Sequence, residues 1–598
     1  MAHVETLTKC CHQKSGSLPL IHITKPPDEE SIALQKLALD DVNNKPNHPC
    51  KSQPGKLYYE VEQKPPLGAA LLLGLQQILV STGSAVAFPI IVAGKICAKE
   101  DGFVRLKLIS NTLICSGIST ILQCTVGIRL PLLQGPGYAF LPPIITMLAL
   151  PEFQCPSDIE HESDLNSTLV DDEIWRSRLQ LIQGGILMAS CIQMLIGLTG
   201  TVGFITKFIG PLTIAPLMIL LSLSLVNSAF QYISKHWTSA LLILILIFFA
   251  VYLNGVKAPI VCPSRKGRII TRWVPVFAMF PYIIAVGASW TLCWMFTETG
   301  LFNNSTDLVV RTDTLNDVIM EAPWIGLPYP GQTGLPIFNA GMFMGMAAGT
   351  LASILESVGD YHACARVVSQ PPPPMHAVNR GIFVEGLGCL VSGFFGGFSV
   401  TTYSENIGVI GITKAASRLT MQLAGILLIL LGVFSKAIAV MAALPDPLVG
   451  SMLVVSMAMV TGVGISSVQL IDLKLSRNIA ILGVTILSGL LIPMFFKNGV
   501  ELTGHSQFDQ AISIFLGTEM IVGGIIGFML DNTVPGASLI QRGLHGAESS
   551  NAKESKIETD VYSFPSYIMK RLNHWKWTAC IPIFPNFKQK FLNNSQML

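Results

Sequence analysis

The sequence predicts an all-α polytopic membrane protein, and three observations lead to that class. Only 13% of the 598 residues are charged, half are apolar and the mean hydropathy is +0.54, whereas a soluble domain carries about 25% charged residues. Apolar stretches of about 20 residues, the length that crosses a bilayer, recur along the chain. The charges gather in two tails and three loops. This composition excludes a disordered chain and a disulfide scaffold, and the net charge of +2 excludes a nucleic-acid-binding chain with a basic face.

Fourteen membrane spans are predicted, and the first begins only at Leu67. Residues 1–66 are therefore expected to be a disordered cytosolic tail and not a cleavable signal peptide. Residues 67–532 form the membrane domain, and residues 533–598 form a second cytosolic tail. We place the spans at 67–94, 108–128, 130–150, 177–198, 208–227, 237–254, 273–297, 339–359, 380–398, 399–416, 420–443, 446–464, 477–496 and 511–532.

The loops between the spans indicate the orientation of the chain. An even number of spans leaves both termini on one side. The loop 255–272 holds five Lys or Arg and no acid, which marks it as cytosolic. The loop 151–178 holds eight acids against two Arg and falls on the outer side, as does 298–334. Both termini are therefore expected in the cytosol.

The outer loops carry two further features. The sequons at Asn166, Asn303 and Asn304 are candidate glycosylation sites, because only a lumenal loop can use them. Cys97 and Cys155 also fall in outer loops. They could form a disulfide or remain two free thiols.

The third and tenth spans cannot be continuous helices. The third contains Gln134-Gly-Pro-Gly-Tyr138, and the tenth contains Val400-Thr-Thr-Tyr403 after two glycines. We expect each to provide a short extended segment followed by a half-helix whose N-terminal amides face a ligand; the alternative is an ordinary kink packed against its neighbours. The two broken spans are seven apart, as an inverted repeat of seven plus seven spans requires.

Four carboxylates lie within fifty residues of the second broken span. Glu356 and Asp360 share one helix face, Glu385 lies in the ninth span, and Glu405 begins the half-helix of the tenth. A charge at that depth usually marks a substrate or ion pathway. The alternative is that a carboxylate is simply paired with a cation such as Arg380. Because no G-x-x-x-x-G-K-[ST] sequence is present to hold ATP phosphates, these features favour ion-coupled secondary transport and not an enzyme.

The stretch from Glu405 to Lys414 resembles a known signature. Glu405-Asn-Ile-Gly-Val-Ile-Gly-Ile-Thr-Lys414 fits the pattern of the nucleobase-ascorbate transporter family, which is Gln, Glu or Pro, then Asn, any residue, Gly, four residues of any kind, Thr, and Arg, Lys or Gly. The chain is similar to the vertebrate branch from about Leu67 to Asn532, with supporting motifs at Glu356-Ser-Val-Gly-Asp360, Pro371-Pro-Pro-Pro374 and Asn379-Arg380-Gly381.

This resemblance implies an architecture. Residues 67–532 become a transporter domain with a core domain of spans 1–4 and 8–11 and a gate domain of spans 5–7 and 12–14. The family also implies a homodimer in the plasma membrane and an elevator-like movement.

The resemblance further implies roles for individual residues. It implies that the substrate is bound by Glu356, Glu405, Tyr138, Tyr403 and Asn406. The ion-coupling residues become Asp360 and Glu385, with Na⁺ expected at Asp360 and H⁺ as the alternative coupling ion. Relatives often have Gln-His in the first span, whereas this chain has Gln76-Gln77. Because Gln does not titrate, this departure favours Na⁺.

The acid at position 405 separates two substrate classes. A nucleobase is a neutral ring whose N–H groups can donate to a carboxylate pair. Ascorbate is an anion, and placing it beside Glu405 and Glu356 would bring like charges together; family members that carry ascorbate have Pro in the first signature position. We therefore predict an importer of uracil, thymine, guanine, hypoxanthine and xanthine. The alternatives are a Na⁺-dependent ascorbate transporter and a non-transporting scaffold or sensor.

Overall fold

The structure is a computed structural model of the chain. It describes residues 57–544, apart from gaps of which the longest fall within 154–166, 249–255, 264–268, 275–280, 303–307 and 497–514, together with residues 561–564 and 582–584. Most of the predicted tail 1–66 and much of the tail 533–598 therefore lie outside the described residues.

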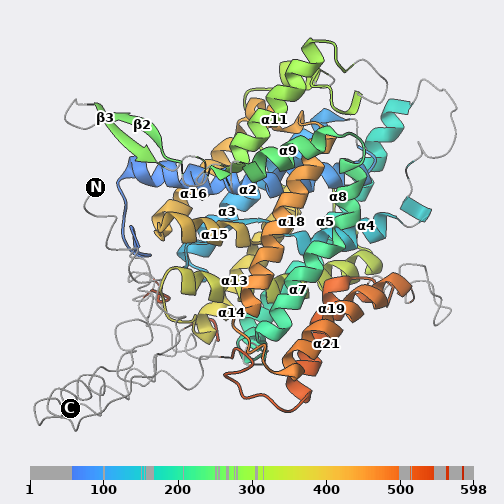
Figure 1. The fold of residues 1–598 in the computed structure, drawn as a ribbon. Helices are drawn as coiled ribbons and strands as arrows, with labels where there is room; N and C mark the ends of the chain where they lie inside the picture. Colours follow the sequence, from blue (N-terminus) through green and yellow to red (C-terminus); the bar gives the residue numbers. More distant parts are fainter. Residues whose placement is uncertain are drawn as a thin grey trace, which may run out of the picture. The chain divides into compact units, whose positions relative to one another are not determined.

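The described chain is a bundle of helices with two small antiparallel sheets (Figure 1). In its first half the elements are α2 (Leu67–Lys95), α3 (Gly102–Thr125), β1 (Gln134–Pro136), η1 (Tyr138–Phe140), α4 (Leu141–Leu148), η2 (Pro151–Phe153), α5 (Ser167–Thr199), α6 (Thr201–Ile205), α7 (Pro211–Ser224), α8 (Val226–Ile233), α9 (Thr238–Ile247), β2 (Ala258–Pro263), β3 (Ile269–Val274), α11 (Pro281–Glu298) and α12 (Asn316–Glu321). In its second half they are α13 (Ala340–Val367), α14 (Met375–Phe395), β4 (Val400–Thr402), α15 (Ser404–Thr413), α16 (Arg418–Val433), α17 (Ser435–Ala442), α18 (Asp446–Val468), α19 (Ser476–Phe496) and α21 (Glu519–Thr533).

The polytopic membrane class is confirmed. Among the described residues, eight helices are long and apolar enough to cross a bilayer, or nine if α16 and α17 together count as one span. The predicted third and tenth spans are interrupted, because each consists of a short strand followed by a short helix. The total of fourteen spans stays a prediction.

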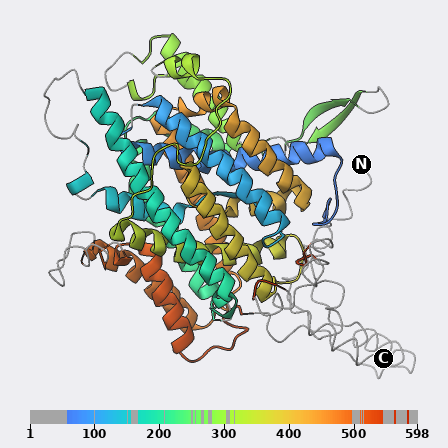
Figure 2. The ribbon, with the colours of Figure 1, turned by 180° about the vertical axis from the view of Figure 1, so that it is seen from behind.

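Three predicted segments need correction. The span predicted at 420–443 is bent by 82° where α16 gives way to α17. The basic loop 255–272 contains strands of a hairpin in which Ala258 pairs with Val274 and Pro263 with Ile269. Residues 273 and 274 belong to this hairpin and not to the span predicted from residue 273. In Figures 1 and 2 this hairpin lies at the end of the molecule where α2 begins.

Helices from the two halves of the chain pack against one another in matching pairs. α3 packs along α16, and α5 packs along α14. If predicted spans 1–7 are matched in order with spans 8–14, α3 corresponds to α14 and α16 corresponds to α5. The first pair of helices therefore corresponds to the second pair. The same matching relates the packing of α2 on α16 to that of α13 on α5, and the packing of α3 on β1 to that of α14 on β4.

The crossing of α3 and α16 depends on two glycines. A Cβ atom added at Gly117 would lie 2.5 Å from the carbonyl oxygen of Gly425, and one added at Gly425 would lie 2.8 Å from the carbonyl oxygen of Gly117. Small residues at such crossings let helix backbones approach closely, which is a main source of helix association in a bilayer.

Replacing Gly117 with leucine is therefore expected to destabilise the protein, by about 1–3 kcal/mol or more from overpacking alone. Thermal denaturation of the purified variant and its abundance at the cell surface measure the effect. Gly462→Leu is the matched control, because a Cβ atom there meets nothing within 4 Å. Equal melting temperatures for the two variants would contradict the importance of the crossing.

The ordered body begins earlier than predicted. Tyr59 forms a parallel bridge with Ala415, and the amide of Arg418 donates to the carbonyl of Val61 at 3.1 Å. Arg418 also forms an ion pair with Glu62. The prediction of a disordered tail up to residue 66 is therefore wrong for residues 57–66, because backbone pairing with the loop after α15 holds this segment in place.

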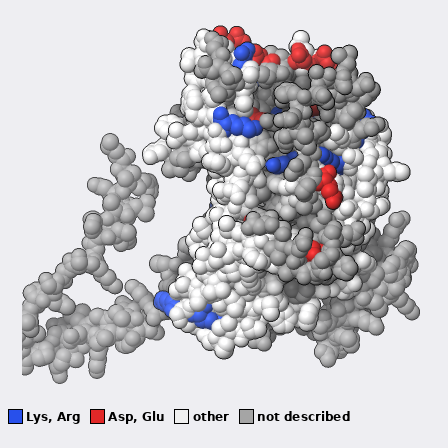
Figure 3. All heavy atoms as spheres, turned by 90° about the vertical axis from the view of Figure 1, so that its right-hand side faces the viewer, with Lys and Arg blue, Asp and Glu red and all other residues white. Residues whose placement is uncertain are grey.

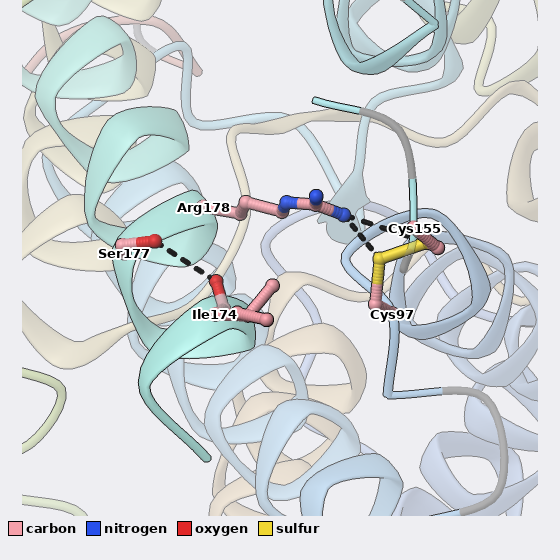
Figure 4. The surroundings of a disulfide bond; sticks show 5 residues. All are labelled: Cys97, Cys155, Ile174, Ser177 and Arg178. Atoms are coloured by element: carbon pink, nitrogen blue, oxygen red, sulfur yellow. Dashed lines mark hydrogen bonds between the residues drawn. A yellow bond between two sulfur atoms is a disulfide. The ribbon is translucent and has the colours of Figure 1, made fainter. Parts of the chain in front are cut away.

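The opposite end of α2 carries a disulfide. Cys97, just beyond α2, is joined to Cys155, with 5.7 Å between their Cα atoms. The guanidinium of Arg178 on α5 donates to the sulfurs of both residues (Figure 4). The predicted glycosylation sites Asn166, Asn303 and Asn304 lie outside the described residues.

One face of the bundle carries few charges among its described residues. In Figure 3 most of the described surface is white, and Lys, Arg, Asp and Glu appear only in scattered groups. On α19 the large apolar side chains Leu487, Leu491 and Met494 are exposed. Such a surface suits contact with lipid, where apolar side chains need no protein cover.

Candidate functional site

The two interrupted spans meet in a small antiparallel sheet. Gln134 pairs with Thr402, Gly135 with Thr401, and Pro136 with Val400. Two backbone bonds extend the pairing, from the amide of Gly137 to the carbonyl of Ser399 at 2.9 Å and from the amide of Tyr403 to the carbonyl of Leu133 at 3.0 Å. The extended segments predicted in these spans are confirmed, and the structure adds that they bond to one another.

A half-helix follows each strand, as predicted. Tyr138 begins η1, which leads into α4, and Tyr403 is the N-cap residue of α15. A Cβ atom at Gly135 would collide with the Tyr403 ring, so glycine is needed where the two segments cross. Both tyrosines are buried.

The four predicted carboxylates converge at this crossing, and all are buried. Glu356 and Asp360 lie on α13, Glu385 on α14 and Glu405 in the first turn of α15. Glu356 lies near the other three acids. Among the described residues, no Lys, Arg or His is within ion-pair distance of any of them.

Arg380, the alternative partner considered from the sequence, turns away from this cluster. Its guanidinium donates to the carbonyls of Gly127 and Tyr562 at 2.6 and 2.7 Å. The four carboxylates therefore do not serve as counter-ions for that arginine.

Glu385 is held by a set of donors. Its carboxylate accepts from the hydroxyl of Ser357 at 2.8 and 2.9 Å, from the Gln193 amide at 3.1 Å, and from the Ser353 hydroxyl at 3.3 Å. The hydroxyls of Tyr361 and Thr402 donate at 3.3 Å. These bonds tie α14 to α5, α13 and β4. Glu385 is thus saturated with hydrogen bonds and fixes the strand that crosses the site.

Asp360 and Glu405 each have a serine partner. The Ser404 hydroxyl donates to the carboxylate of Asp360 at 2.7 and 2.9 Å, which joins α15 to α13. The Ser84 hydroxyl of α2 lies 3.2 Å from Glu405 Oε1 and 3.1 Å from the Ser456 hydroxyl of α18. Three elements distant in sequence therefore meet at Glu405.

Glu356 differs from the other three carboxylates. Its Oε2 atom is buried and accepts no hydrogen bond from the described residues. The hydroxyls of Tyr138 and Tyr403 are also buried without a partner in the described part of the chain. Buried polar atoms are normally satisfied, because an unmet one costs about 1–3 kcal/mol. Unmet groups from α13, η1 and the β4–α15 junction therefore indicate a place for a polar ligand.

Asn406 lies beside Gln77, and its proposed contact with the substrate stays a prediction. Its amide nitrogen donates to the side-chain and backbone oxygens of Gln77 at 2.7 and 2.9 Å. Gln77 stands where relatives often have His, and it provides the acceptor that orients Asn406. The Oδ1 atom of Asn406 is buried and has no partner among the described residues.

The signature stretch forms α15, and its last position has a conformational reason. Lys414 is the C-cap residue of α15 and has a φ of 56°. This left-handed conformation favours glycine, which agrees with a signature that allows Gly there. Its carbonyl accepts the amide of Tyr58 at 2.9 Å.

Several site residues were missed from the sequence. They are the hydroxyl and amide side chains that hold the carboxylates, namely Ser84, Gln193, Ser353, Ser357, Thr402, Ser404 and Ser456. A scan for polar side chains inside the apolar spans would find them. It would not say which of the four acids each one contacts.

The site can bind a ligand that brings hydrogen-bond donors or positive charge. Four buried carboxylates without a cation form an unfavourable arrangement unless protons, N–H donors or a metal ion reach them. An anion would add repulsion to that arrangement.

Comparisons with known proteins agree with the motif. The model of a family described as “Permease family” matches residues 68–498. The rat protein “Solute carrier family 23 member 2” is 39% identical, over 91% of this chain and 85% of that protein. The mouse protein “Solute carrier family 23 member 1” is 37% identical, over 91% of each. “Nucleobase-ascorbate transporter 2” of Arabidopsis thaliana is 32% identical, over 82% of this chain and 90% of that protein.

Proposed function

The chain belongs to the permease family that includes the nucleobase-ascorbate transporters, and from that premise we propose that it is a secondary active importer of nucleobases. Members of this family are membrane transporters and not enzymes. The proposed substrates are uracil, thymine, guanine, hypoxanthine and xanthine.

One observation carries the choice of substrate class. The unpartnered carboxylate of Glu356 and the carboxylate of Glu405 lie in one buried cluster with no cation among the described residues. Adjacent ring N–H groups of a nucleobase would donate to such a pair, and each charge-assisted bond contributes about 1.5–3 kcal/mol. Tyr138 and Tyr403 would present ring faces and hydroxyls to the base.

The site is less suited to ascorbate. The negative charge of ascorbate would lie beside Glu356 and Glu405 in a water-poor site, where the repulsion between like charges is weakly screened. Glu405 also occupies the signature position at which ascorbate carriers of the family have Pro. A Na⁺-dependent ascorbate transporter and a scaffold or sensor on the same fold remain the alternatives to be tested.

We propose Na⁺ as the coupling ion and H⁺ as the alternative. Asp360 offers a carboxylate beside the Ser404 hydroxyl, and hard oxygen ligands of this kind suit Na⁺. No cluster of three His, Cys, Asp or Glu arranged for a metal is present in the described ranges, so hydroxyl and backbone oxygens would complete the shell. Glu385 already accepts hydrogen bonds from several donors. We therefore propose that it positions the strand that crosses the site, in addition to its proposed role in ion coupling.

We propose alternating access by movement of the core domain against the gate domain. The matched pairs of α3 with α16 and α5 with α14 support a seven-plus-seven inverted repeat. The proposed gate helices α7, α18, α19 and α21 pack together. The Ser84–Ser456 hydrogen bond joins the two groups beside Glu405, so a core movement would change the surroundings of the substrate.

The proposed location is the plasma membrane, with a homodimer and both termini in the cytosol. The disulfide supports this orientation, because disulfides persist in oxidising compartments and Cys97 lies at the end of α2 remote from Leu67. Asn166, Asn303 and Asn304 would then face outward and be open to glycosylation.

Replacing Na⁺ by choline at constant pH is expected to reduce uracil uptake by at least tenfold in cells that express the chain. In Na⁺ buffer, excess guanine should compete with labelled uracil, and excess ascorbate should not. Cells without the chain are the control. Uptake that is unchanged in choline would exclude Na⁺ coupling, and competition by ascorbate alone would contradict the proposed substrate class.

A further inference from the structure

An apolar groove runs along the outside of the bundle between α2 and α16. It has a volume of about 490 Å³, and the side chains that line it are all apolar, namely Leu75, Ile78, Leu427, Leu430, Leu431 and Phe434. Three of them are exposed, Leu75 at 44%, Leu430 at 58% and Phe434 at 42%. Because these side chains offer no hydrogen-bond donor or acceptor, the groove suits a hydrocarbon chain.

The Phe434 end of the groove lies at the end of the molecule that carries the disulfide. Phe434 is the C-cap residue of α16, and the chain bends there by 82° into α17. The ammonium of Lys436 in α17 donates to two carbonyls of α12 at 2.6 and 2.7 Å. α12 also lies against the start of α3, because a Cβ atom at Gly102 would collide with Val318. Since α3 begins shortly after Cys97, this end faces outward in the proposed orientation.

A tryptophan and a lysine stand at that end of the groove. The centre of the Trp324 ring lies 5.9 Å from the centre of the Phe434 ring and 5.9 Å from the ammonium of Lys436. Trp324 is 67% exposed, and residues 322–338 around it contain no Lys, Arg, Asp or Glu. Tryptophan, and lysine whose stem covers apolar surface, are typical of the boundary between lipid headgroups and acyl chains.

The Lys436 ammonium keeps a donor for a further partner. An ammonium has three N–H donors, and the two carbonyls of α12 accept from it. No acid of the described ranges forms an ion pair with Lys436. A phosphate at the level of the lipid headgroups would receive a charge-assisted hydrogen bond from this lysine.

We propose that the groove and Lys436 together form a binding site for one phospholipid, with an acyl chain between α2 and α16 and the phosphate ester at Lys436. The apolar groove ends at the cation, so the two parts of the site match the two parts of this molecule. A second copy of this chain would have to bring an apolar helix and an acid in the same arrangement, whereas the bilayer supplies both chemistries. The inference goes beyond transport and does not depend on the nature of the substrate.

The test compares two photoactivatable lipids in phosphatidylcholine vesicles that contain the full-length protein. One probe is a phosphatidylcholine, and the other is a diacylglycerol with the same diazirine-bearing acyl chains, so only the first carries a phosphate. Mass spectrometry measures labelling of the groove and of the exposed α19 side chains Leu487, Leu491 and Met494. In wild type the ratio of phosphatidylcholine to diacylglycerol labelling should be about tenfold higher in the groove than on α19, the factor that one charge-assisted bond supplies.

Three variants make the result specific. Lys436→Gln should lower the ratio in the groove to the ratio on α19, while diacylglycerol still labels the groove. Leu430→Trp fills the groove and should reduce labelling there by both probes, which serves if Lys436→Gln does not fold. Leu491→Trp is the matched control on α19 and should leave labelling of the groove unchanged.

Equal ratios in the groove and on α19 of wild type would overturn the site, as would a wild-type ratio in Lys436→Gln. Cross-links between two copies of the chain at the groove would also overturn it, because a partner subunit would then cover the surface. No nucleobase is present in this experiment, so failure of the proposed transport function would appear only in uptake assays.

Discussion

Replacing Glu356 with alanine is expected to reduce uracil uptake at least about tenfold, because the substrate loses a charge-assisted hydrogen bond worth about 1.5–3 kcal/mol. Glu356 is buried and its Oε2 atom has no partner among the described residues, so its removal breaks no ion pair. The fold should persist, and the melting temperature should stay within a few degrees of wild type. Initial rates with radiolabelled uracil, normalised to surface protein, measure the effect.

Glu321→Ala is the matched control for this prediction. Glu321 ends α12 and is exposed, so its removal also deletes one acid but should leave uptake unchanged. Wild-type uptake by Glu356→Ala would show that Glu356 does not bind the substrate. A collapse of surface expression would instead indicate a structural role.

Replacing Glu405 with proline is expected to abolish nucleobase uptake while the protein still reaches the surface. Glu405 is the second residue of α15, and proline is tolerated in the first turn of a helix, where amides have no intrahelical acceptor. The change removes the acceptor for the substrate and for the Ser84 hydroxyl, with little cost to the helix.

Glu405→Gln separates charge from shape in the same assay. It keeps the size of the side chain and an oxygen for Ser84 but loses the charge, so uptake should fall at least tenfold. Retained uptake in both variants would contradict a carboxylate pair as the nucleobase site. Gain of ascorbate uptake in Glu405→Pro would support the charge argument for substrate choice.

The interrupted spans were predictable because their cause is local. Gly and Pro around Gln134–Tyr138, and the β-branched run before Tyr403, exclude a continuous helix wherever the segment lies. The charge argument for the intramembrane acids is also local, since any acid inside a span needs a reason. The pairing of Gln134 with Thr402 was not predictable, because register between segments 268 residues apart depends on how all the helices pack.

The partners of the acids were not predictable for the same reason. In the sequence Glu385 and Glu356 are both acids within or beside apolar spans. Tertiary packing surrounds Glu385 with hydroxyls and leaves Glu356 Oε2 without a donor among the described residues. The bend between α16 and α17 was missed because the apolar pattern continues through it. In the structure Lys436 donates to the carbonyls of Ile319 and Met320, which anchors α17 to α12.

The most direct test of the central claim is accumulation of labelled substrates by proteoliposomes that contain only this protein, with an inward Na⁺ gradient. The account predicts that uracil and guanine accumulate above their external concentration, that ascorbate does not, and that Glu356→Ala abolishes the accumulation. Accumulation of ascorbate without uracil or guanine would contradict it.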